Sequence, residues 1–146
     1  MGELTIPSAM AVSLRRLRSG SAMMTHRPEW ATDAELMEMR QFIRASLRPA
    51  GFTTTAEHLD GVAKLIAMPK DEEARLVYVE ALKDFPPDVL AKSCKSVVLS
   101  HLSQRPPTVA VFVRACRENL DYQRRLGWQR AIDGLMTDRS AEEDSA

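Results

Sequence analysis

Aromatic residues are scarce in this chain, at 5% of 146 residues, although 45% of its residues are hydrophobic. Any core must therefore be packed mainly from aliphatic and methionine side chains. The formal net charge is zero at pH 7, so no global field draws the chain onto nucleic acid or an anionic membrane. No apolar run approaches the roughly 20 residues that cross a bilayer, and the N-terminus lacks the hydrophobic stretch of a secretory signal. These absences favour a cytoplasmic globular chain without membrane partners.

Residues that hold metals or perform catalysis are also few. Cys94 and Cys116 stand 22 positions apart, which matches no metal-binding spacing, and the three histidines are scattered. The six glycines form no phosphate-binding loop. Cys94 and His101 share one helical face, but a core thiol beside a partly buried imidazole is a commoner arrangement than a nucleophile pair. We therefore expect no cofactor, no metal and no enzymatic activity.

Amphipathic periodicity predicts an all-α bundle of about five helices over residues 31–121, after a basic, flexible leader over residues 1–30. Thr32 with Glu35, and Thr54 with Glu57, have the spacing of capping boxes that start the first two helices. The third helix has a broad apolar arc, which predicts a central position. The first four predicted helices lie in "TDAELMEMRQFIRASLRP", "TTTAEHLDGVAKLIAMP", "KDEEARLVYVEALKDFPP" and "DVLAKSCKSVVLSHLSQ".

The stretch "SQRPPTVAVFVRAC" has both a strand-like and a helix-like pattern. Alternating valines resemble one face of a strand, whereas Val109, Phe112, Val113 and Cys116 have the i, i+3, i+4, i+7 spacing of a helix. The two prolines favour a non-helical corner, and Thr108 follows them where an N-cap is needed. A strand here would have no partner strand elsewhere in the chain. We therefore predict a fifth helix that begins after Thr108.

Beyond this helix, residues 122–137 are predicted to form a projecting helix or a partner-binding segment. The acidic residues 138–146 are predicted to be a disordered tail. An exposed tryptophan flanked by arginines is typical of an interface hot spot. The predicted partner-binding residues in this segment are Arg124, Arg125, Leu126, Trp128 and Ile132.

A second hypothesis is a DNA-binding regulator. The fourth helix, the proline corner and the fifth helix together have the order of a helix-turn-helix. The first turns of the fifth helix are apolar, however, whereas a base-reading helix presents polar side chains there. The alternative nucleic-acid surface is therefore a basic stripe made of Arg114, Arg117, Arg124, Arg125 and Arg130. A third hypothesis is a helical adaptor or self-associating protein.

One stretch resembles a known family. "YVEALKDFPPDVLAKSCKSVVLSHLSQRPPTVAVFVRACREN", within residues 71–120, resembles the bacteriophage replicative-helicase loader and inhibitor family, which includes replisome organisers. The resemblance lies in "EALKDFPPDVL" and in a "PPT-x-A" corner that opens the next helix. Val111 departs from it, because the family has an acidic residue there that completes a capping box. This departure suggests a partner surface around Val111.

The resemblance implies a small all-helical protein without enzymatic activity that binds a replicative helicase, restrains its ATPase and delivers it to an initiator-bound origin. The expected function is therefore that of a phage or prophage replication accessory protein. Its expected partners are a replicative helicase and an initiator protein.

Overall fold

The capping residue predicted for the first helix is present in the structure, a computed structural model that describes residues 32–144 and their side chains as far as Thr137. The Glu35 main-chain N–H donates to Thr32 Oγ1 at 3.2 Å, immediately before helix α2 (Asp33–Ser46). This bond satisfies one of the N–H groups that the first turn leaves without a helical partner. The predicted leader over residues 1–30 lies outside the described residues.

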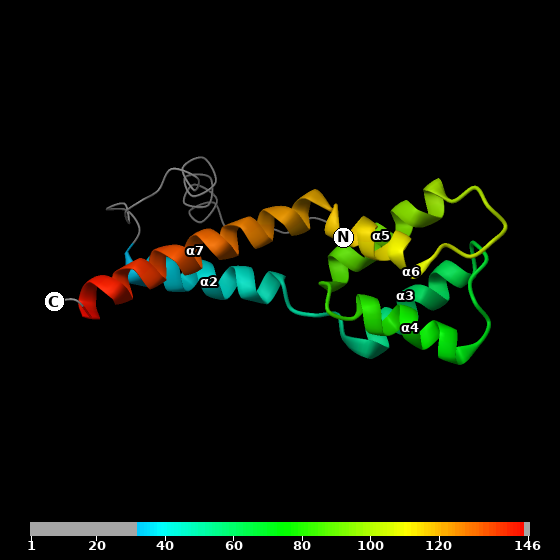
Figure 1. Cartoon of the computed structure of the whole chain (residues 1–146), viewed down its shortest axis with the longest axis horizontal. Helices are drawn as coiled ribbons and strands as arrows, with labels where there is room; N and C mark the ends of the chain where they lie inside the picture. Colours follow the sequence, from blue (N-terminus) through cyan, green and yellow to red (C-terminus); the bar gives the residue numbers. More distant parts are fainter. Residues whose placement is uncertain (1–31, 145–146) are drawn as a thin grey trace. The chain divides into compact units, whose positions relative to one another are not determined.

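The all-α fold class is confirmed, since the described residues form six helices and no strand (Figure 1). After α2 these are α3 (Gly51–Ala63), α4 (Glu72–Leu82), α5 (Pro87–Ser100), α6 (Val109–Arg117) and α7 (Leu120–Asp144). The five helices predicted for the bundle correspond to α2–α6, and α7 begins three residues after α6 ends at Arg117. Asn119 accounts for this restart, because its Oδ1 accepts from the Tyr122 main-chain N–H at 3.1 Å, as an N-cap does.

Helix α3 begins at Gly51, so the predicted start at Thr54 is wrong. Gly51 has φ +83°, a conformation that glycine adopts without a Cβ penalty. The Ala50 and Gly51 N–H groups donate to the carbonyls of Phe85 and Lys83 at 2.9 and 3.0 Å. These bonds to a distant segment satisfy donors at the start of α3, so the helix needs no side-chain cap from a threonine.

The proline-rich corner precedes a helix, as predicted. Thr108 is extended, with φ −71° and ψ 162°, and α6 follows it directly, so the helical period prevails over the strand-like alternation. The Tyr78 hydroxyl of α4 donates to the Pro107 carbonyl at 2.7 Å and so ties the corner to its neighbouring helix. Thr108 adopts the N-cap conformation, but its side chain makes no capping hydrogen bond.

Residues 47–123 form one compact unit around a single apolar core. Aliphatic side chains dominate this core, as the shortage of aromatics predicts, and Tyr78 and Phe112 meet edge to face at 5.9 Å between ring centroids. Phe85 and Tyr122 form a second edge-to-face pair at 5.3 Å. The other buried members of the core are Leu59, Val62, Met68, Val79, Leu82, Val89, Leu90, Cys94, Val97 and Cys116.

Residues 32–46 and 124–144 belong to a second unit, in which α2 and α7 lie side by side (Figure 1). Arg125 Nη1 donates to the Ser46 carbonyl at 2.9 Å, and Arg40 Nε lies 3.3 Å from Asp133 Oδ1. These contacts pair the end of α2 with the early part of α7, so the two helices are antiparallel.

Helix α2, which was predicted to belong to a bundle over residues 31–121, is grouped with α7 in this second unit. The backbone of α7 also continues as helix to Asp144, through most of the segment predicted to be a disordered tail. Alanine and glutamate in that segment have high helix propensity, which supports propagation of an established helix.

Candidate partner-binding surface

The partner surface predicted on α7 is largely buried. Trp128 is 6% exposed, Arg125 is 1% exposed and Ile132 is fully buried, so the prediction of an exposed tryptophan anchor is wrong. Arg124 remains exposed, and its guanidinium carbon lies 5.9 Å from the centroid of the Trp128 ring. Leu126 is partly buried. These residues therefore do not form a continuous apolar surface.

These residues of α7 are buried because α7 and α2 each carry a row of apolar side chains on one face. Arg125, Trp128, Ile132 and Leu135 recur at intervals of three and four along α7, which places them on one face of the helix. Leu36, Met39 and Ile43 do the same along α2 and are also buried. The sequence thus shows an apolar face on each of the two helices but not that these faces meet, and the polar "DYQRR" at the start of α7 makes its apolar face harder to recognise.

Arg125 is buried for a structural reason. Its hydrogen bond to the Ser46 carbonyl satisfies an acceptor at the C-terminal end of α2, where helix carbonyls lack helical partners. A positive charge is also favourable at this negative end of the helix dipole. Arg125 therefore stabilises the second unit and is not available to a partner or to nucleic acid.

The alternative basic stripe is interrupted by this burial. Arg114 and Arg117 are exposed on α6, and Arg124 and Arg130 are exposed on α7, but Arg125 between them is buried. The two pairs also belong to different units of the molecule. Within the described residues Arg125 is therefore not part of an exposed basic stripe.

Both thiols are buried and protonated at neutral pH. Burial, with a smaller contribution from the neighbouring Cys116, raises the pKa of Cys94 to about 12. Burial also raises the pKa of Cys116, although a hydrogen bond with Ser93 acts in the opposite direction. His101 Nε2 lies 2.6 Å from the Arg105 carbonyl, in the connection that follows α5. A thiol with so high a pKa is a poor nucleophile at neutral pH, and the His101 Nε2 atom contacts the Arg105 carbonyl.

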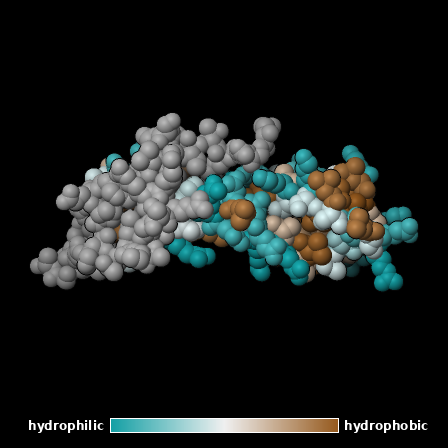
Figure 2. Space-filling view, turned by 90° about the horizontal axis from the view of Figure 1, so that it is seen from above, coloured by the Kyte–Doolittle hydropathy of each residue, from teal (hydrophilic) through white to brown (hydrophobic). Residues whose placement is uncertain are grey.

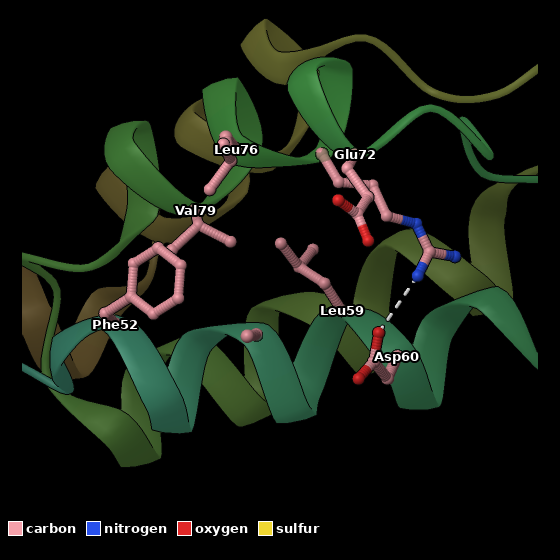
Figure 3. A pocket seen from close by; sticks show the side chains of 8 residues that line it. Phe52, Leu59, Asp60, Glu72, Leu76 and Val79 are labelled. Carbon is pink, nitrogen blue, oxygen red and sulfur yellow. Dashed lines mark hydrogen bonds and ion pairs between the residues drawn. The ribbon is translucent and has the colours of Figure 1, made fainter.

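An open groove of about 350 Å³ lies between α3 and α4 (Figure 3). Phe52 and Leu76 line it from opposite helices and are 49% and 45% exposed, although both are large apolar residues. Leu59 and Val79 are buried beneath them and join the groove to the core. Apolar surface that is hollowed and open to solvent in this way is typical of a binding site.

The opposite end of the groove is polar. The carboxylates of Asp60 on α3 and Glu72 on α4 lie there, away from Phe52 and Val79 (Figure 3). Arg75 Nη1 donates to Asp60 Oδ1 at 3.0 Å, and its Nε donates to the Pro69 carbonyl at 2.7 Å. These two bonds hold the guanidinium in place, so Arg75 connects the two walls of the groove.

Only part of this groove is visible in the sequence. Leu76 extends the apolar arc of α4 beyond its main stripe, which is the one signal that apolar surface remains uncovered. Phe52 precedes the predicted start of its helix and therefore has no place in the periodic pattern. The approach of α3 to α4 depends on the bonds that join Ala50 and Gly51 to the end of α4, and local patterns do not encode such bonds.

Other apolar side chains are exposed as well. Leu99 lies in the last turn of α5 and Leu102 in the connection to α6, and they are 74% and 97% exposed. Figure 2 shows several hydrophobic areas on the unit that contains α3–α6, with hydrophilic residues between them. Single exposed leucines are common on protein surfaces, whereas the groove combines several apolar side chains in one hollow.

Comparison of the chain with family models, with curated proteins and with solved structures finds no match. Within residues 32–144 no helix is long and apolar enough to cross a membrane. The part of the chain that the structure describes also contains no group of three or more histidine, cysteine or acidic residues that could hold a metal ion.

Proposed function

We propose that this protein is a replication accessory factor that binds a ring-shaped replicative helicase and acts by protein–protein contact. The observation that carries the proposal is the open groove between α3 and α4, whose Phe52 and Leu76 side chains are half exposed in a hollow continuous with the core. An apolar hollow of this kind gains free energy when a partner's apolar side chains fill it.

The resemblance to the helicase-loader family supports the choice of partner. Residues 71–120, which carry the resemblance, are the ones that form α4, α5 and α6. Helix α4 is one wall of the groove, so the segment that resembles the family also supplies half of the proposed binding surface. The all-helical fold agrees with the architecture that this family implies.

The proposal is tested with the purified full chain and the hexameric replicative helicase encoded in the same genome. Light scattering after size-exclusion chromatography measures complex formation, and a coupled assay measures the ATPase rate of the helicase. We expect a stable complex and a lower ATPase rate. A helicase that stays uncomplexed at micromolar concentrations of both proteins would refute the proposal.

Two adjacent substitutions on α4 provide a matched comparison. Leu76→Asp places a charge inside the groove and is expected to weaken helicase binding by about tenfold or more. Val77→Asp is the control, because Val77 is 58% exposed on the same helix and does not line the groove. Far-UV circular dichroism shows whether both variants remain folded. Equal loss of binding in both variants would exclude the groove as the contact surface.

Duplex DNA provides the test of the regulator hypothesis. If the protein binds DNA with a steep dependence on salt concentration, and Arg114→Glu with Arg117→Glu abolishes that binding, DNA contact through α6 replaces helicase binding as the function.

A further inference from the structure

The groove between α3 and α4 is polarised along its length. Its apolar end contains Phe52, Leu76 and Val79, and its acidic end contains Asp60 and Glu72 (Figure 3). Glu72 and Leu76 are four residues apart on α4, so the acidic and apolar ends are separated by about one helical turn, roughly 6 Å. Ala56 and Asp60 repeat the same interval on α3.

The surroundings of the groove are also acidic. The segment 51–82, which contains both walls, has six acidic residues against three lysines and arginines, and therefore a formal charge of −3 in a chain whose total is zero. Arg75 is the only basic residue among those that line the groove, and it is held by Asp60 and the Pro69 carbonyl. Glu72 is exposed at the same end of the groove, so the local potential there favours a cation.

The shape of the groove favours a helix. Its walls are two helices that run in opposite directions, with α3 going from the apolar to the acidic end and α4 returning (Figure 3). The lining residues of α3 span Phe52 to Asp60, about 12 Å or two helical turns. Two helix surfaces side by side form ridges between which a third helix packs, and anchors on such a helix recur at i, i+3 and i+4.

We propose that the groove binds an amphipathic helix of a partner protein that presents a large apolar side chain and, one turn away, an arginine or lysine. The apolar side chain lies against Phe52, Leu76 and Val79, and the cationic group lies beside Glu72. This inference rests on the proposed protein-binding role and names its surface and the chemistry of its partner. Its test uses a peptide in place of a helicase, so the two proposals can fail separately.

The probe is a lactam-constrained helical peptide of about 15 residues, built from alanine and glutamine, with two leucines at i and i+3 and an arginine one turn beyond each. It is titrated into the ¹⁵N-labelled full chain while backbone amide shifts are recorded by NMR. We expect the largest shifts at Leu59, Asp60, Leu76 and Val79. A companion peptide with glutamates in place of the arginines is expected to bind at least about tenfold more weakly. Shifts located elsewhere, or equal binding of the two peptides, would overturn the proposal.

Neighbouring glutamates on α4 separate a specific contact from general charge attraction. Glu72→Gln removes a carboxylate that lines the groove, whereas Glu73→Gln removes the same charge from an exposed side chain that does not line it. The first is expected to weaken binding of the arginine peptide by about fivefold and the second by less than about twofold. An equal effect of the two substitutions would show that only the overall negative charge matters and would overturn the inferred contact.

The chain's own basic leader is the competing occupant. Arg15, Arg16 and Arg18 have the charge that the groove favours, so the peptide titration is repeated with all three changed to glutamate in the full chain. Unchanged peptide affinity supports an external partner. A rise in affinity of about tenfold would show that the leader occupies the groove and would overturn the assignment to a partner protein.

Discussion

Substitution of Val111 by glutamate is expected to stabilise the protein, because helix α6 has an incomplete N-terminal cap. Thr108 occupies the N-cap position with extended backbone angles, but its side chain makes no capping bond, and Val111 is the third residue of the helix. A glutamate at this position can accept a hydrogen bond from the Thr108 main-chain N–H and complete a capping box. Its negative charge also lies at the positive end of the helix dipole.

The magnitude follows from the exposure of Val111, which is 42%. A reciprocal cap and the dipole together contribute about 1–1.5 kcal/mol. Somewhat more than half of the valine surface is covered, and replacing it costs about 0.5 kcal/mol, because the glutamate methylenes retain part of the contact. The expected net gain in the free energy of unfolding is therefore about 0.5–1 kcal/mol.

Urea denaturation followed by circular dichroism measures this change, with an unchanged m-value as the sign that the unfolded state is unaffected. Val111→Gln keeps the capping geometry without the charge and should give about half of the gain. Val111→Ala removes the valine contacts without adding a cap and provides the packing reference. If Val111→Glu and Val111→Ala each lower the free energy of unfolding by about 1 kcal/mol or more, the reasoning is refuted. A loss of that size would mean that the valine side chain makes a buried contact.

Three further predictions follow from buried groups. Trp128→Ala should lower the free energy of unfolding by about 3–5 kcal/mol in denaturation experiments, whereas Trp128→Phe should cost far less, because the indole Nε1 has no hydrogen-bond partner in the described residues. Tyr78→Phe should cost about 1–3 kcal/mol by thermal unfolding, since it leaves the buried Pro107 carbonyl without its donor; an unchanged melting temperature would contradict this. Burial raises the pKa of Cys94 from 9.0 to about 12. The contribution of the protonated Cys94 thiol to the free energy of unfolding is therefore fully present below pH 9 and is lost as the pH rises toward 12. The unfolding free energy should therefore fall over that interval, less steeply in Cys94→Ala, and both Cys94 and Cys116 should resist alkylation at pH 8 until the protein unfolds; rapid labelling of the native protein would count against burial.

Local patterns predicted much of the helical architecture. Thr32 caps α2 as expected, and α5 begins at Pro87, one residue before the stretch predicted for it, where a proline costs no hydrogen bond. The strand-like alternation around Val111 was correctly assigned to a helix, because the preceding prolines impose the corner from which α6 starts. These features depend on interactions between residues only a few positions apart, so they can be predicted from short stretches of sequence.

The predictions that failed all depend on residues that are distant in the chain. Helix α3 starts early because Ala50 and Gly51 bond to the end of α4, more than 30 positions away. The sequence pattern of α7 showed an amphipathic face but not what would cover it, so Trp128 was predicted to be exposed. No local rule selects α2 as the covering helix, since a bundle of α2 with α3–α6 satisfies the same periodicity.

The sequence by itself determined the all-α class, the caps and corners that delimit most helices, and the aliphatic character of the core. Only the tertiary structure decided that α2 pairs with α7, that Arg125 satisfies the end of α2 from within the protein, and that Phe52 and Leu76 remain open in a groove with carboxylates at one end. The periodicity of apolar residues predicts which face of a helix is apolar, because local helix geometry determines the direction in which each side chain points. Which apolar face meets which other one depends on the path of the whole chain, and this choice determines whether a face becomes core or binding surface.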